Sequence, residues 1–120
     1  MVDSLIVAKK RKPEYLLLTF EAARLDPANC AVLQSELASG LAADPIDMIV
    51  DMGAIAYAVS PAVNVILDAH ERCRKAGRMM VLIRVQPSVR RILSLSGLGS
   101  VLVMRETMAE AIDLLKSARE

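Results

Sequence analysis

The sequence predicts a single α/β domain built on a mainly parallel β-sheet. Short apolar runs alternate with longer segments whose apolar residues recur at helical spacing, which is the pattern of strands joined by crossover helices. Two helical segments open with an Asp-Pro or Ser-Pro pair, and two close at a glycine. A chain of 120 residues that is 54% hydrophobic can bury one core and has no room for a second.

Five short apolar runs are typical of strands. They cover residues 5–8, 15–20, 46–52, 79–85 and 101–104. The run at 46–52 is apolar at its centre, as expected for a strand that is covered on both faces. The consecutive basic residues at 9–12, followed by Pro13, indicate a solvated hairpin tip that discourages edge-to-edge pairing. An anion or membrane contact is the less favoured interpretation of this run.

Four amphipathic segments predict helices. They cover residues 27–43, 61–76, 87–96 and 108–118. At the second segment, Ser60 is the expected N-cap and Pro61 the first helical residue. Because the chain shows no internal repeat, low-complexity tract or linker, we expect one domain over residues 1–120.

The composition disfavours several classes of function. Aromatic residues make up 2% of the chain and the formal net charge is +1, so we expect no nucleic-acid partner. Cys30, Cys73 and the single histidine, His70, show no metal-ligand spacing, and we expect neither a metal nor a cofactor. Two lone thiols favour a reducing compartment. Because no run has a signal-peptide order or approaches the roughly 18 residues of a membrane span, we expect a cytoplasmic protein that is not membrane-embedded.

No set of residues predicts catalysis. Asp51 ends a strand at the edge where open α/β sheets bind ligands, but the acidic pair and lysine of a phosphoaccepting receiver domain are absent, so we interpret it as a satisfied carboxylate. The G-x-G at 97–99 lacks a third glycine, and Gly97 is better explained as a helix cap. His70 is expected to be solvated, with no nucleophile or acid in evident reach. The sequence therefore predicts a protein that is not an enzyme.

One series of motifs runs along the chain. I-V-D-M at 49–52 ends a strand, Tyr57 and Ser60 stand in the following loop, and V-I-L at 65–67 lies in the next helix. The rest of the series is L-D at 25–26, R-K-A-G at 74–77, V-L-I at 81–83, P-S-V-R-R-I-L at 87–93 and S-G-L at 96–98. In order and spacing this series resembles the STAS domain, the family of anti-sigma factor antagonists such as SpoIIAA and of the cytoplasmic tails of sulfate transporters.

The resemblance implies a fold and a function. The STAS fold has four to five mostly parallel strands and about four helices, mainly on one face of the sheet. The implied function is non-enzymatic regulation of bacterial transcription, by docking a serine kinase of the histidine-kinase ATPase type that acts as an anti-sigma factor. Docking would use the loop at 54–64 and the following helix. The residues expected to contact the partner are Ile55, Tyr57, Val59, Ser60, Pro61, Val63 and Asn64.

The loop departs from the family pattern around Ser60, the position of the serine that the family phosphorylates. Val59, Pro61 and Ala62 stand where the family has an aspartate, a serine or threonine, and a glycine. Ser60 is therefore either a phosphoacceptor that switches partner binding or only a helix cap. A second function stays open, that of a non-phosphorylated accessory subunit of a larger assembly, such as a lipid-trafficking ABC transporter or a stress-sensing scaffold. The sequence leaves the oligomeric state undetermined.

Overall fold

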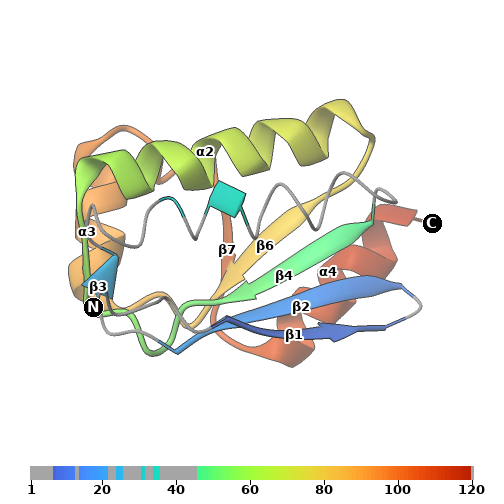
Figure 1. The fold of residues 1–120 in the computed structure, drawn as a ribbon. Helices are drawn as coiled ribbons and strands as arrows, with labels where there is room; N and C mark the ends of the chain where they lie inside the picture. The colour runs from blue at the N-terminus through green and yellow to red at the C-terminus, as the bar shows by residue number, and fades with distance from the viewer. Residues whose placement is uncertain are drawn as a thin grey trace.

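The fold is a β-sheet with helices packed on both faces (Figure 1), seen here in a computed structural model. The structure describes residues 7–12, 14–21, 24–25, 31, 34–35 and 46–119; of 7–11, 24–25, 60 and 119 it describes the backbone alone. The strands are β1 Val7–Arg11, β2 Tyr15–Phe20, β3 Arg24–Leu25, β4 Asp47–Asp51, β5 Tyr57–Ala58, β6 Met80–Ile83 and β7 Val103–Arg105. The helices are α2 Ser60–Lys75, α3 Pro87–Leu95 and α4 Met108–Arg119.

The main sheet has five strands in the order β1-β2-β4-β6-β7. Only the β1–β2 pair is antiparallel, and the three other neighbouring pairs are parallel. The prediction of four to five mostly parallel strands is confirmed. The helix predicted at 27–43 lies outside the described residues, apart from residues 31, 34 and 35, which are helical.

Side chains alternate between the two faces of the sheet, which builds two apolar layers. On one face, residues of β2, β4 and β6 pack with α2 and α3: Leu16, Leu18, Phe20, Met48, Val50, Met80 and Leu82 are all buried there. On the other face, Ile49, Val81 and Ile83 pack against Ala111 and Leu115 of α4. Each large side chain that is fully buried contributes about 1.5–3 kcal/mol relative to exposure, so both layers hold the strands in register.

Residues 9–11 of the basic run belong to β1 and only Lys12 lies in the hairpin turn, so the prediction of a hairpin tip is wrong for three of the four residues. Lys9 pairs with Leu18 and Arg11 with Leu16 across the antiparallel ladder, and the turn is confined to the residues after Arg11. The pairing follows from the length of β2, since residues 16–20 all have register partners on β1. Basic residues on this edge strand still discourage pairing with another chain.

Helix α2 begins one residue earlier than the Ser-Pro pair predicts. The N-cap is Val59, in an extended conformation, and its carbonyl accepts the amides of Ala62 and Val63 at 3.0 and 3.3 Å. The prediction of Ser60 as N-cap is therefore wrong. Pro61 lies in the first turn, where its missing N–H costs no helical hydrogen bond.

The two predicted glycine caps are confirmed. Gly77 and Gly97 both have positive φ angles, of 72° and 77°, which a side chain would make unfavourable. Beyond each glycine an amide bonds the carbonyl five residues earlier, as in a Schellman motif: Arg78 N–H donates to the Cys73 carbonyl at 2.8 Å and Leu98 N–H to the Leu93 carbonyl at 2.9 Å. These turns send the chain from α2 into β6 and from α3 towards β7.

Candidate functional site

The predicted docking loop lies at the carboxyl ends of two parallel strands. Asp51 ends β4, and its register partner Ile83 ends the neighbouring strand β6. Parallel strands present their carboxyl ends at one edge of the sheet, where connecting loops gather side chains into sites. We refer to the connection from Gly53 to Val59 as loop 53–59.

A buried carboxylate anchors the start of this loop. The Gly53 amide donates to Asp51 Oδ1 at 2.9 Å, and Arg84 Nε donates to the same oxygen at 3.2 Å. Arg84 Nη2 pairs with the other carboxylate oxygen, which makes the ion pair bidentate. The hydrogen bond to Asp51 and the attraction of its charge raise the pKa of Arg84. Asp51 is thus a satisfied carboxylate at the end of a strand, as the sequence predicted.

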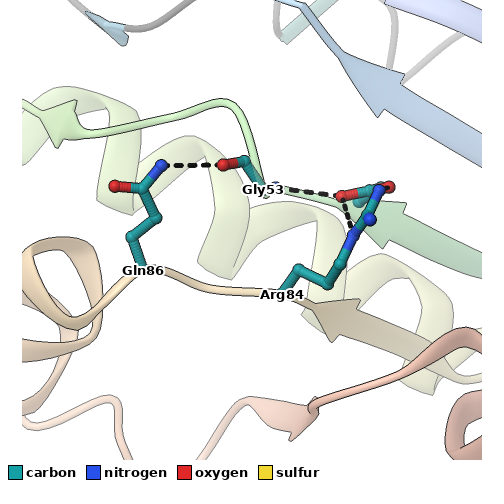
Figure 2. A network of polar contacts seen from close by, with 4 residues as sticks. Gly53, Arg84 and Gln86 are labelled. Carbon is teal, nitrogen blue, oxygen red and sulfur yellow. Dashed lines mark hydrogen bonds and ion pairs between the residues drawn. The ribbon is translucent and has the colours of Figure 1, made fainter.

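Arg84 adopts a left-handed backbone conformation with φ 55°, which is uncommon for residues other than glycine. Beyond this turn, two further side chains reach loop 53–59. Gln86 Nε2 donates to the Gly53 carbonyl at 2.7 Å (Figure 2), and Ser88 Oγ donates to the Ala56 carbonyl at 2.8 Å. The segment that follows β6 therefore contacts the loop that follows β4 through side chains.

Sequence reasoning missed these contacts, because no local motif marks a hydrogen bond between residues 33 positions apart, as Gln86 and Gly53 are. The available signal was the position of Arg84 directly after a strand. The β3–β5 pair was missed too. In it, Arg24 pairs with Tyr57 in parallel, and two-residue strands leave no periodicity to detect.

The structure sorts the predicted contact residues by accessibility. Tyr57 is 45% exposed; Pro61 and Asn64 are exposed and Val59 is half-buried. Of Ser60 only the backbone position at the start of α2 is described. The side chains of Ile55 and Val63 are instead buried in the core.

The prediction is corrected for Ile55 and Val63. A partner cannot touch these side chains without unfolding the loop. Ile55 packs in the main core because the loop returns over the sheet, where the Ile55 amide bonds the Met52 carbonyl at 3.0 Å. Val63 is buried because it lies on the core-facing side of α2. Tyr57 of the loop and Pro61 and Asn64 of α2 form the accessible part, which we call the exposed loop face.

The polar groups around the loop are occupied by one another. On the α4 side of the sheet end lies a shallow pocket of about 370 Å³, whose lining includes the Asp51–Arg84 pair, Glu106 and Met108. Glu106 is paired with Arg90 at 3.2 Å. Within the described part of the chain, no three His, Cys, Asp or Glu side chains gather to hold a metal ion.

His70 differs from its prediction. It is half-buried on α2, and its Nδ1 atom is buried with no hydrogen-bond partner among the described residues, whereas the sequence predicted a solvated side chain. The helix lies across the apolar layer, so a residue at the border of its buried face is partly covered. None of the described helices is long and apolar enough to cross a membrane.

Comparison with known proteins gives one family. The family model for the STAS domain matches residues 7–111 of the chain. No curated protein sequence gives a significant match.

Solved structures share the fold. The chain is similar to an anti-sigma factor antagonist from Mycobacterium paratuberculosis, with 15% identity, a TM-score of 0.81, and coverage of 93% of this chain and 94% of that one. It is similar to Bacillus SpoIIAA in its unphosphorylated form, with 18% identity, a TM-score of 0.77, and coverage of 93% and 97%. It is also similar to part of the murine anion transporter Slc26a9, with 12% identity, a TM-score of 0.74, and coverage of 90% of this chain and 18% of that one.

Proposed function

The chain belongs to the STAS domain family, and on that premise we propose that it is a non-enzymatic regulatory protein that docks a partner protein through residues 54–64 and the exposed side of α2. The observation that carries this proposal is the exposure of Tyr57 between the buried residues Ile55 and Ala58. Tyrosine is enriched among the residues that dominate binding energy at interfaces. Because its neighbours are fixed in the core, presenting this side chain costs little conformational entropy on binding.

The partner that we propose is a serine kinase of the histidine-kinase ATPase type that acts as an anti-sigma factor. Similarity to structures described as anti-sigma factor antagonists supports this choice. Phosphorylation of Ser60 is part of the proposal. Helix α2 has no side-chain cap and no acidic residue in its first turn, so the partial positive charge of its N-terminus favours a phosphate there. A doubly charged group beside the exposed loop face would then alter the surface that the partner contacts.

A second candidate function is a non-phosphorylated accessory subunit of a larger assembly, such as a lipid-trafficking ABC transporter or a stress-sensing scaffold. Two residues favour it. Val59 replaces the family's aspartate and Ala62 replaces its glycine, so the loop lacks both the acid and the flexible residue of the phosphorylated loop. Val59 is half-buried against the core and Ala62 is fully buried, so both side chains serve in packing. The similarity to a segment of Slc26a9 supports this alternative, since that structure is an anion transporter.

Cytoplasmic localisation is part of the proposal. Cys73 is a free, buried thiol, and thiols that stay reduced are typical of reducing compartments.

The docking proposal is tested by affinity capture from lysate of the source organism, with and without ATP, followed by mass spectrometry. Wild-type protein should retain a soluble histidine-kinase-type ATPase in a nucleotide-dependent manner. Tyr57→Ala should lose most of that retention. Val101→Ala is the matched control, because Val101 is 42% exposed and lies outside the exposed loop face. Retention of transporter or scaffold subunits regardless of ATP would favour the second candidate, and equal loss in both variants would contradict docking through the loop.

Substitution of Ser60 separates the two candidates further. If phosphorylation switches docking, Ser60→Asp should weaken retention of the ATPase at least about tenfold, since one charge at a tight interface is worth 1.4 kcal/mol or more. Ser60→Ala should bind as wild type and accept no phosphate. Incubation with the captured ATPase and labelled ATP is the measurement, and label that persists in Ser60→Ala would contradict Ser60 as the acceptor.

A further inference from the structure

We propose that Gln86 and Ser88 are positioning residues that hold loop 53–59 in the shape presented to the partner. The importance of that shape rests on the proposed function, but the holding itself does not. Neither residue belongs to the exposed loop face. Both act on it through carbonyl groups of the loop, Gln86 through Gly53 and Ser88 through Ala56.

Three side chains of the segment after β6 bind successive points from the end of β4 into loop 53–59. Arg84 binds Asp51 at the end of β4, Gln86 binds the Gly53 carbonyl, and Ser88 binds the Ala56 carbonyl. Between these contacts the backbone passes from the left-handed Arg84 through the extended Gln86, with φ −65° and ψ 151°, into the first turn of α3. The contacts therefore advance along the two segments in the same direction.

The segment that makes these contacts is held in place by α3. Gln86 is the N-cap of α3 and Ser88 lies in its first turn. Val89 and Leu93 of that helix are buried in the main core. A hydrogen bond donated from such a fixed element restricts the loop more than one donated from another loop would.

The Ser88 contact lies next to the exposed side chain of Tyr57 in the sequence. The Ala56 carbonyl belongs to the peptide that leads directly into Tyr57. Loss of the Ser88 bond therefore frees the backbone next to the residue that carries the docking proposal. The expected change is local loosening of the loop without global unfolding.

The test measures amide hydrogen exchange in the free protein by NMR. In Gln86→Ala and Ser88→Ala, exchange of the Gly53 and Ile55 amides should accelerate about fivefold, the effect of losing one net hydrogen bond. Core amides of β4 and β6 should exchange as in wild type. Unchanged exchange at both loop amides in both variants would overturn the proposal.

Two further variants separate positioning from a general effect on α3. Ser88→Thr keeps the hydroxyl and should restore slow loop exchange. Ser94→Ala removes an exposed serine elsewhere on the same helix and should leave the loop unaffected. Loop exchange that accelerates equally in Ser94→Ala would show a helix effect and overturn the role of Ser88.

Binding of the captured ATPase distinguishes failure of this inference from failure of the proposed function. Its dissociation constant should rise about fivefold in Gln86→Ala and Ser88→Ala and recover in Ser88→Thr, since a looser loop must be ordered on binding. Faster loop exchange with unchanged affinity would support the positioning role of Gln86 and Ser88 but overturn the loop as the docking surface. Unchanged loop exchange with reduced affinity would overturn that positioning role and support the loop as the docking surface.

Discussion

Two buried aspartates lie at opposite ends of β4 and point to the same face of the sheet. Asp47 is 5% exposed and Asp51 6%. At the amino end, Asp47 accepts the amide of Met79 at 2.9 Å and so closes the connection from α2 to β6. At the carboxyl end, Asp51 accepts the amide of Gly53 and binds Arg84.

The difference lies in what each carboxylate holds. Asp47 is bonded to the backbone of a connection that leads directly into a strand. Asp51 joins the loop after β4 to the side chain that follows β6, and further contacts from that segment hold loop 53–59. The two buried aspartates therefore differ in role: Asp47 supports a structural link at the amino end, and Asp51 supports a candidate docking site at the carboxyl end. The loops that follow parallel strands lie together at that carboxyl end.

The largest expected effect belongs to the amino end and appears at alkaline pH. Burial, aided by the charge of Asp47, raises the pKa of the Cys73 thiol from 9.0 to about 11. Below pH 9 the thiol is protonated in both states and stability is at its full value. Between pH 9 and 11 the unfolded chain releases the proton while the folded chain keeps it, so the free energy of unfolding falls by up to about 3 kcal/mol.

Urea unfolding of wild type and Cys73→Ala between pH 7 and 11 measures this contribution. The variant is less stable at pH 7 because it leaves a cavity, but its stability should fall less steeply above pH 9. Parallel pH dependence of the two proteins would contradict the raised pKa.

The next effect concerns the carboxyl end. Asp51→Ala should cost about 2 kcal/mol, since it leaves the Gly53 amide without its acceptor and Arg84 in a left-handed conformation without its partner. The cost stays below that of a fully buried pair because the Arg84 side chain is 61% exposed and can be hydrated. Chemical denaturation gives the cost, and NMR shifts of loop 53–59 should change.

Asp47→Ala is the matched variant. It should cost about 1 kcal/mol or more through the unsatisfied Met79 amide, and it should leave the shifts of loop 53–59 at their wild-type values. Larger changes in the NMR shifts of loop 53–59 in Asp47→Ala than in Asp51→Ala would contradict the claim that only the carboxyl end of β4 holds the loop.

The smallest effect compares two glycines. A methyl group on Gly53 would lie 3.2 Å from Asp51 Oδ1 and 3.4 Å from the Arg84 side chain, so Gly53→Ala pushes on the ion pair. Gly77 has nothing within 4 Å, and there Ala is disfavoured by its φ of 72° alone. We expect each substitution to cost about 1 kcal/mol, but only Gly53→Ala should accelerate hydrogen exchange in the loop. Equal rates of hydrogen exchange in loop 53–59 of the two variants would show that a side chain at Gly53 does not disturb the Asp51–Arg84 ion pair.

Elements with strong local patterns were predicted well. Tyr15–Phe20 was predicted with its full bounds because its apolar run is set off by polar neighbours. Gly77 and Gly97 were identified as caps because the positive φ angle that ends a helix favours glycine, and a glycine can be recognised at a single position of the sequence. The mainly parallel direction of the strands followed from their alternation with helices.

The rest depended on contacts between distant residues. The basic residues of β1 adopt a strand conformation because they pair with β2, and no local sequence pattern predicts that pairing. Burial of Ile55 depends on how the loop returns over the core. The apolar loop therefore predicted a broad contact surface, whereas Tyr57 is the large apolar side chain of loop 53–59 that is exposed. The anchor formed by Asp51 and Arg84 joins two separate strands, and each residue alone predicts nothing about the other.

The measurement that tests the central claim most directly is site-specific photocrosslinking in lysate of the source organism. A photoreactive phenylalanine analogue would replace Tyr57 in one variant and Val101 in the other. The docking account predicts one dominant protein crosslinked from position 57 and little of it from position 101, with the product reduced when Gln86→Ala is added. Crosslinking of the same protein from position 101 and not from position 57 would contradict the account.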